Sequence, residues 1–159
     1  MKSTVLVALF ASLIALASPQ IEAQASGALP GNWAIDFERG RRMENGQATS
    51  IMGIGKVTIR ESGDSLLAIF DMGPRPDGTV VPPSTVGGRM TPAGAVFVQK
   101  QTVDVNMNGA VQTREITLTW TLQADGDVLT GTLGRAMAMR DEPLPPTPVK
   151  GKRIVGSPD

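Results

Sequence analysis

The segment "EITLTWTL", from Glu115 to Leu122, alternates polar and apolar residues without a break. Successive side chains of a β-strand point to opposite faces, so this segment predicts a strand with one buried face and one face in water. Short segments of the same kind recur beyond Ser26, separated by clusters of Gly, Pro, Asn and Asp, and no convincing helical run interrupts them. This pattern is typical of an all-β domain.

The number of these segments narrows the fold further. Strands are predicted at residues 32–38, 51–60, 65–72, 79–87, 94–107, 110–123, 128–139 and 149–155. Eight strands can close a small barrel whose interior is filled by side chains or holds one ligand. We therefore predict a single antiparallel, mostly up-and-down eight-stranded barrel, with a β-sandwich as the alternative.

Two hairpins can be aligned residue by residue. Asn108-Gly109 and Asp125-Gly126 favour two-residue type I′ turns, because both central positions of such a turn need a positive φ. A third hairpin is consistent with a turn at Gly63-Asp64. The predicted pairs are Met107–Ala110, Val103–Arg114, Gln101–Ile116, Gln99–Leu118 and Phe97–Trp120 in the first hairpin, Leu122–Leu129, Trp120–Gly131, Leu118–Leu133, Ile116–Arg135 and Arg114–Met137 in the second, and Val57–Phe70 and Ile59–Ala68 in the third.

The registers of the first two hairpins were assigned independently, and they agree on which residues share a face. This agreement supports the pairing, because a slip of one residue would invert both faces. The apolar face carries Phe97, Val103, Ile116, Leu118, Trp120, Leu122, Leu129 and Leu133. The other face carries Lys100, Thr102, Glu115, Thr117, Thr119, Thr121, Thr130 and Thr132. An outer-membrane barrel would point its apolar side chains outward, so this polar outer face indicates a barrel or sandwich that lies in water.

The first 25 residues have the organisation of a secretory signal peptide. Lys2 supplies the positive charge, residues 4–18 form an apolar segment, and Ala23-Gln24-Ala25 gives the small-residue cleavage pattern. The apolar segment is too short for a spanning helix. We expect a signal peptide at residues 1–25 and a β-barrel domain at residues 26–159, in a periplasmic or secreted protein that does not span a membrane after cleavage.

Composition excludes several chemistries. The chain has no cysteine and no histidine, which removes thiolate nucleophiles, disulfides, and the commonest general base and metal ligand. Its 15 basic and 15 acidic residues balance, so nucleic acid is not expected as a partner. Two pairs of aspartates, Asp71 with Asp77 and Asp125 with Asp127, could serve acid–base catalysis, but all four lie at turn signals. No Gly-x-Ser-x-Gly or Ser-x-x-Lys nucleophile motif is present beyond the predicted signal peptide. We predict a non-catalytic protein with no cofactor and no metal site.

Gly31-Asn32-Trp33, at the head of the first predicted strand, resembles the Gly-x-Trp signature of the lipocalins. The resemblance implies that Trp33 lies across the closed end of a barrel and that an arginine from a late strand packs over it. Arg153 occupies the matching position, and a guanidinium on an indole ring is favourable because the ring face attracts cations. The chain departs from the family in lacking a cysteine pair and a visible helix after the barrel.

Polar residues interrupt the apolar face toward one end of the predicted barrel. Arg114 and Arg135 are diagonal neighbours in the predicted register, close enough to share one anion. We expect a cavity at this end that takes a small hydrophobic or amphipathic molecule whose acidic head meets the two arginines. Its predicted lining is Phe97, Gln99, Gln101, Arg114, Trp120, Arg135, Met137 and Met139, and the alternatives are that the arginines are solvated or are neutralised by Asp104, Asp141 or Glu142.

A second class of function is binding to another protein. Leu67 and Ile69 are predicted on the outward face of their strand, and Val96 and Val98 also point outward. If these strands meet, they form an exposed apolar patch that suits a protein partner. An exported protease inhibitor or a component of an envelope complex would fit this alternative. A barrel filled by its own side chains would favour protein binding, whereas a continuous interior cavity would favour binding of a small molecule.

Overall fold

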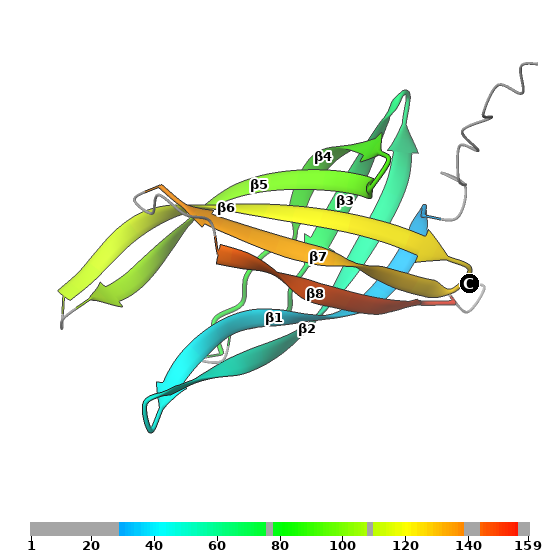
Figure 1. The fold of residues 1–159 in the computed structure, drawn as a ribbon. Coiled ribbons are helices and arrows are strands. Elements are labelled where there is room, and N and C mark those ends of the chain that lie inside the picture. The colour runs from blue at the N-terminus through cyan, green and yellow to red at the C-terminus, as the bar shows by residue number, and fades with distance from the viewer. Residues whose placement is uncertain (1–28, 76–77, 108–109, 139–143, 156–159) are drawn as a thin grey trace, which may run out of the picture.

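A computed structural model describes residues 29–75, 78–107, 110–138 and 144–155. The predicted signal peptide lies outside these residues. The described chain forms one closed barrel of eight antiparallel strands in sequence order, which confirms the predicted barrel and excludes the sandwich (Figure 1). The strands are β1 (Gly31–Glu44), β2 (Gln47–Ser62), β3 (Ser65–Asp71), β4 (Ser84–Thr91), β5 (Gly94–Met107), β6 (Ala110–Asp125), β7 (Val128–Met137) and β8 (Leu144–Arg153).

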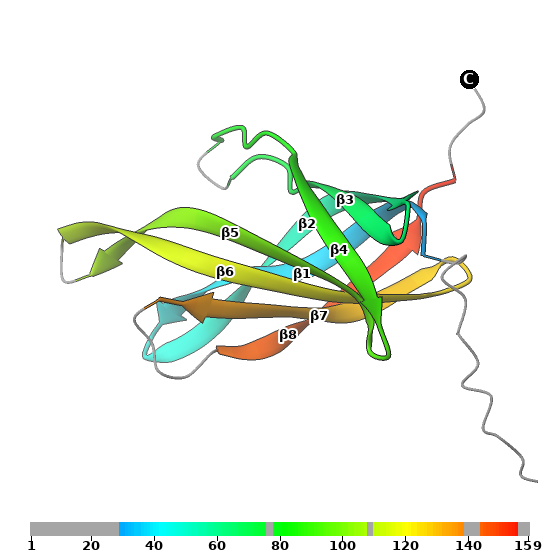
Figure 2. The same ribbon diagram turned by 90° about the horizontal axis from the view of Figure 1, so that it is seen from above.

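Two short strand pairs lie beside the longest hairpins of the barrel. β1 meets β8 over five residue pairs, from Trp33–Arg153 to Phe37–Val149. β4 meets β5 over four pairs, from Gly88–Phe97 to Thr91–Gly94. The much longer hairpins β1–β2 and β5–β6 therefore continue past these seams as two projecting ribbons, which diverge from one another in both views (Figures 1 and 2).

The ribbon of β1 and β2 is longer than the sequence predicted. Pairing continues to Glu44–Gln47, and Asn45-Gly46 makes the turn with φ angles of 51° and 79°. Positive φ at both central residues is the type I′ geometry that Asn-Gly favours. The prediction had ended the first strand at residue 38 and begun the second at residue 51, so this turn signal was missed.

The hairpin registers are confirmed in two cases and wrong in one. All five predicted pairs of β5 with β6 are present, as are both predicted pairs of β2 with β3. In the hairpin of β6 and β7, Leu122 pairs with Gly131 rather than with Leu129. The reason is that Gly126, with a φ of 57°, is the first central residue of the turn, as Gly63 is in the β2–β3 turn with a φ of 60°. The shift is two residues, so the faces are unchanged.

Prolines explain two corrected strand boundaries. β4 begins at Ser84 rather than residue 79 because Pro82 and Pro83 cannot donate backbone hydrogen bonds. β8 begins earlier than predicted, at Leu144, and carries three prolines before Val149. These prolines are tolerated because β1 no longer pairs with this part of β8, so one of its edges needs no N–H donors.

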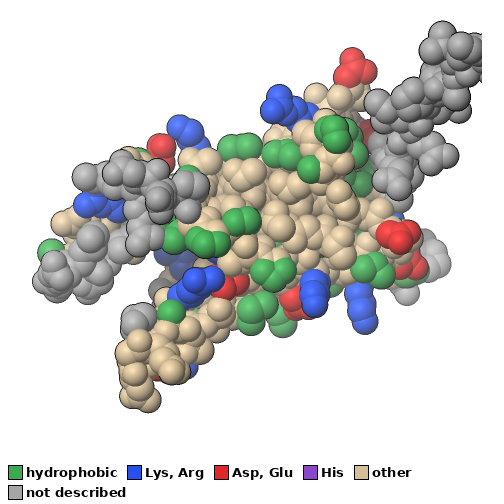
Figure 3. Space-filling model, viewed as in Figure 1, with side chains coloured by type: hydrophobic (Ala, Val, Ile, Leu, Met, Phe, Trp, Pro, Cys, Tyr) green, Lys and Arg blue, Asp and Glu red, His purple; other side chains and the backbone are tan. Residues whose placement is uncertain are grey.

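The apolar face fills the barrel. Seven of the eight residues predicted on it are buried, and the eighth, Val103, packs against the core. The buried apolar residues are Leu29, Trp33, Ile35, Phe37, Val57, Ile59, Leu66, Ala68, Phe70, Val86, Ala95, Phe97, Ile116, Leu118, Trp120, Leu122, Leu129, Leu133 and Val149. The face toward the viewer in Figure 3, over β6 and β7, is mostly tan, the colour of the backbone and of side chains that are neither hydrophobic nor charged, as the alternation predicted.

Candidate functional site

The residues predicted to bind a ligand are spread along the barrel axis. Phe97 and Trp120 are fully buried at its centre. Gln99 is half-buried and donates to the Ser84 hydroxyl at 3.0 Å, whereas Gln101 is exposed. Met137 is half-buried against the core. Met139 lies outside the described residues.

Arg114 and Arg135 are not brought together, which corrects the predicted anion site. Arg135 lies opposite Leu118 on β6, four residues along that strand from Arg114. Each residue advances a strand by about 3.4 Å, so the two arginines are offset by about 14 Å along the strand, twice the offset of a diagonal pair. The error follows directly from the two-residue shift in the β6–β7 register. Arg114 is half-buried and donates a hydrogen bond to the Gln112 side chain.

Arg135 is held by the protein's own polar groups. Its guanidinium donates to the Glu38 backbone oxygen and, at 3.1 Å, to the Thr147 hydroxyl. Its Nη1 lies 3.9 Å from Glu38 Oε1, and the two side chains are only 12% and 11% exposed. The carboxylate that neutralises Arg135 is therefore Glu38. Three other carboxylates were predicted as alternatives for neutralising the arginines. Asp104 instead accepts a hydrogen bond from the Thr113 hydroxyl, and Asp141 and Glu142 lie outside the described residues.

Glu38 lies where β1 departs from regular pairing, and sequence alternation missed it. The register of β1 with β2 shifts between Glu38 and Gly40, just beyond the last residue that pairs with β8. Strict alternation after Phe37 would point Glu38 to water. Instead, it fills the opening between β1 and the β7–β8 pair, where the Ser50 hydroxyl donates to Oε2 at 2.6 Å and Arg41 donates to Oε1 at 3.0 Å.

These partners lower the pKa of Glu38 below its ordinary value, chiefly through the Ser50 hydrogen bond, with Arg41 and Arg135 adding to the effect and burial opposing it. Burial lowers the pKa of Arg135, which the charge of Glu38 counteracts. Arginine nevertheless stays charged at neutral pH. The group is therefore a satisfied ion pair that seals the seam between β1 and β8.

Replacing Glu38 with glutamine should lower the free energy of unfolding at pH 7 by about 1–2 kcal/mol, since hydrogen bonds to a charged acceptor are lost in a desolvated site. A lowered folded-state pKa gives stability that is present above the unfolded carboxyl pKa of about 4.3 and is lost as the pH falls through the folded value. The difference between wild type and variant should accordingly shrink below about pH 4. Urea titrations across pH measure it.

Glu44 provides the control for this experiment. It pairs with Arg42 at 2.7 Å on the projecting part of β1, where its side chain is 48% exposed. The Glu44→Gln variant should change stability by less than about 0.5 kcal/mol at any pH, because exposed pairs contribute little. A pH-independent difference for Glu38→Gln would contradict the assigned ion pair.

The centre of the barrel is occupied by aromatic rings. Trp120 stacks on Phe70 with centroids 4.9 Å apart and meets the edge of Phe37 at 5.6 Å. Phe70 in turn contacts Phe97 at 5.9 Å. Two hollows lie elsewhere, around Asn32 and Thr58, near the end of the barrel where Trp33 lies.

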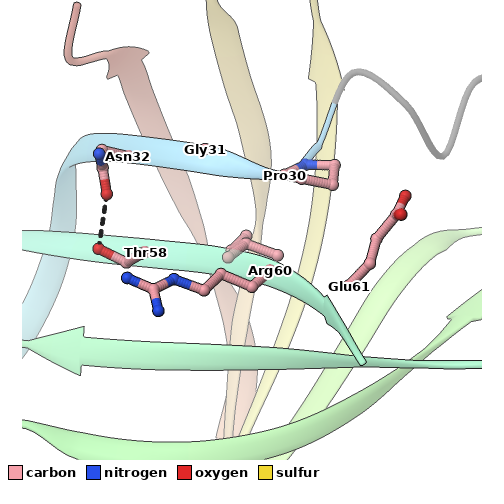
Figure 4. A pocket seen from close by; sticks show the side chains of 7 residues that line it. Pro30, Gly31, Asn32, Thr58, Arg60 and Glu61 are labelled. Atoms are coloured by element: carbon pink, nitrogen blue, oxygen red, sulfur yellow. Dashed lines mark hydrogen bonds between the residues drawn. The ribbon is translucent and has the colours of Figure 1, made fainter. Parts of the chain in front are cut away.

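The first of these hollows is shown in Figure 4, lined by Pro30, Gly31 and Asn32 of the entry to β1 and by the end of β2. Thr58 donates to the Asn32 side chain at 2.8 Å across it. Arg60 and Glu61 complete its rim with opposite charges.

At the closed end the structure places Arg153 directly opposite Trp33, with its guanidinium carbon 4.2 Å from the centre of the indole. Arg153 also donates to the Pro30 and Gly126 backbone oxygens and pairs with Asp127 at 3.1 Å. The Trp33 indole N–H donates to the Leu29 backbone oxygen at 2.9 Å. One arginine thus ties β8, the β6–β7 turn and the entry to β1 together.

Gly31 makes this arrangement possible. Its φ is 145°, and a Cβ at this position would lie 2.3 Å from Arg153 Nη1. The Gly31→Ala variant should lose about 1–3 kcal/mol of stability through backbone strain and displacement of the guanidinium. Thermal unfolding, together with the indole N–H chemical shift of Trp33, measures both effects. Gly40→Ala is the control because nothing lies within 4 Å of its Cβ; equal losses in both variants would contradict the explanation.

The outer surface carries apolar side chains that the sequence prediction identified only in part. Leu67 and Ile69 point outward but are half-buried, while Val98 is 53% exposed. Met52 at 63% and Ile54 at 75%, on the outer face of β2, are more exposed than these three. Both could have been found by extending the alternation of Val57 and Ile59 back through Gly53 and Gly55, which face inward.

The described chain is a closed eight-stranded antiparallel barrel, an architecture consistent with a lipocalin-like fold. In comparisons with known proteins, no family model, no curated protein and no solved structure matches it significantly. Within the residues that the structure describes, we find no helix of the length and hydrophobicity that membrane crossing requires. The same residues contain no cluster of three or more potential metal ligands.

Proposed function

We propose that the protein is an exported, lipocalin-like barrel that acts without catalysis, by binding another protein through its outer surface. The observation that carries this proposal is the filled interior. The centre holds Phe37, Phe70, Phe97 and Trp120, and Arg135 is already neutralised by Glu38. The interior groups expected to receive a small ligand are thus largely engaged with one another.

Exposed apolar residues on the outer surface support the same proposal. Met52 and Ile54 lie on the part of β2 that precedes its first pair with β3, Lys56–Asp71. Burying side chains of this size against a partner is favourable by about 1.5–3 kcal/mol each. We define Met52 and Ile54 as the β2 apolar patch, and the half-buried Leu67 and Ile69 as a secondary contact area.

The test is native mass spectrometry of the protein purified from its own cells. We expect a co-purifying polypeptide that is lost from an Ile54→Glu variant and retained by Val128→Glu, since Val128 is also exposed, at 53%, but lies on β7. A polypeptide retained by both variants would show that the β2 apolar patch is not the contact. A bound small molecule and no polypeptide would contradict the proposal.

One observation favours a second candidate, a carrier of a small amphipathic molecule. Trp120 is 1% exposed, yet its indole nitrogen has no hydrogen-bond partner among the described residues. A buried unpaired donor is costly, so an acceptor atom of a ligand or an ordered water would satisfy it. The half-buried Val103 and Met137 would line the approach from the open end.

A titration with a fatty acid or an apolar dye tests the carrier. If the ligand reaches the centre, we expect one-to-one saturation that Trp120→Phe weakens and Trp33→Phe leaves unchanged, because Trp33 lies at the closed end. Weak, non-saturating binding by all three proteins would exclude this candidate and leave protein binding.

A further inference from the structure

The ribbon formed by β5 and β6 has an open strand edge. β5 pairs with β6 from Ala95–Leu122 to Met107–Ala110, but the last residue that pairs with β4 is Phe97. From Val98 onward, the edge of β5 that faced β4 has no strand partner within the described chain. An open edge presents unpaired N–H and C=O groups and is a template for another strand.

The direction of the free backbone groups follows from the register. Opposite residues in an antiparallel pair alternate between those that exchange both backbone hydrogen bonds and those that exchange none. Met107 and Ala110 are the closing pair of a two-residue connection and exchange both, so odd-numbered residues of β5 bond to β6. The even-numbered residues Lys100, Thr102 and Asp104 therefore direct their backbone groups to the open edge.

These three residues form a sequence that is complementary to itself. We propose that the open edge of β5 pairs antiparallel with the same edge of a second copy of this chain, about a two-fold axis at Thr102. Lys100 of each copy then lies opposite Asp104 of the other, and Thr102 lies opposite its equivalent. The result is a continuous sheet of β6, β5, and the β5 and β6 of the second copy.

Charge favours this axis over axes at Lys100 and at Asp104. An axis at Lys100 would place two lysines opposite each other, and an axis at Asp104 would place two aspartates opposite each other, which is unfavourable. With the axis at Thr102, both cross-strand pairs are attractive. A lysine in an edge strand usually discourages self-pairing, and here an aspartate four residues later offsets that effect.

The ribbon already holds these side chains on its outer face. Lys100 pairs with Glu115 at 3.3 Å, with side chains 69% and 55% exposed. Asp104 Oδ1 accepts a hydrogen bond from the Thr113 hydroxyl at 2.8 Å. In the dimer, Lys100 would lie between Glu115 of its own chain and Asp104 of the second copy. A two-fold interface of this kind closes on itself and produces a dimer rather than a filament.

Charge exchange tests the proposal by sedimentation velocity of the purified protein over a concentration series. We expect a reversible dimer whose Kd rises at least about tenfold in Lys100→Glu and in Asp104→Lys, because each change places like charges opposite each other. The double variant Lys100→Glu/Asp104→Lys should restore the wild-type Kd. Arg42→Glu makes the same change of charge on the other ribbon and should have no effect.

Two substitutions at the axis test the backbone pairing. Thr102→Pro removes an N–H that faces the open edge, so the monomer should keep its thermal stability while the dimer is lost. Thr102→Cys should give a covalent dimer under mild oxidation, because the chain contains no other cysteine. Thr130→Cys, exposed on β7, should not.

A monomer at every concentration, or a dimer in which the double charge exchange fails to restore association, would overturn the proposal. The proposed dimer does not depend on the proposed binding of a protein partner. The dimer is measured on the purified protein alone, whereas the Ile54→Glu comparison reports on the β2 apolar patch. Either proposal can therefore fail while the other holds.

Discussion

Replacing Trp120 with alanine should lower the free energy of unfolding by about 3–5 kcal/mol, the largest effect we expect of any single change in the core. Trp120 is 1% exposed and contacts Phe70 and Phe37 in the centre of the barrel. Truncation removes the burial of the indole and leaves a cavity that the paired strands cannot collapse to fill. Equilibrium denaturation in guanidinium chloride measures the loss.

The neighbouring Thr119 is the matched control, because it precedes Trp120 on the same strand but points to the outer face. Thr119→Ala should change stability by less than about 0.5 kcal/mol. A loss below about 1 kcal/mol for Trp120→Ala would mean that the aromatic centre is loosely packed, and it would move the proposed function toward the small-molecule carrier.

Gly131→Ala should also destabilise the protein severely, by about 3 kcal/mol, because the new methyl group has no space. A Cβ at Gly131 would lie 2.0 Å from the Thr121 backbone oxygen and 3.0 Å from a methyl carbon of Leu122. The backbone of β6 would have to move, which would disturb its pairing with β7. Thermal and chemical denaturation of the variant measure the cost.

Gly134 on the same strand is the control for Gly131. Its Cβ would meet only Thr119, at the ordinary contact distances of 3.6 and 3.7 Å. We expect Gly134→Ala to be neutral, or slightly stabilising because alanine restricts the unfolded chain. Similar stabilities for the two variants would show that β6 and β7 are not paired in the described register.

The fold was largely predictable because its strands alternate strongly and pair with their sequence neighbours. The Asn108-Gly109 signal gave the β5–β6 register to the residue. The β6–β7 register was ambiguous because Gly126 belongs to two possible turns, Asp125-Gly126 and Gly126-Asp127. The competing choices differ by two residues, so burial patterns could not distinguish them.

The polar group at the seam was not predictable in the same way. Glu38 meets Arg135 beside the bulge of β1 and just past the end of its pairing with β8, and strict alternation shows neither feature. The predicted pairing of Arg114 with Arg135 failed for a related reason, since a two-residue shift moves a side chain by about 7 Å along the strand. A register error of two residues therefore leaves the predicted fold correct, but it separates residues that were predicted to share a site.

The short seam between β1 and β8 has a consequence for how the chain reaches its native state. Every other strand pair joins neighbours in sequence, whereas these five pairs join opposite ends of the described chain. The loop-closure entropy of that step is the greatest in the molecule, and few contacts compensate for it. We expect a curved, open sheet to assemble first and the pairing of β1 with β8 to form last. The same five pairs should then be the first strand pairs to exchange their amide protons when the native protein opens locally.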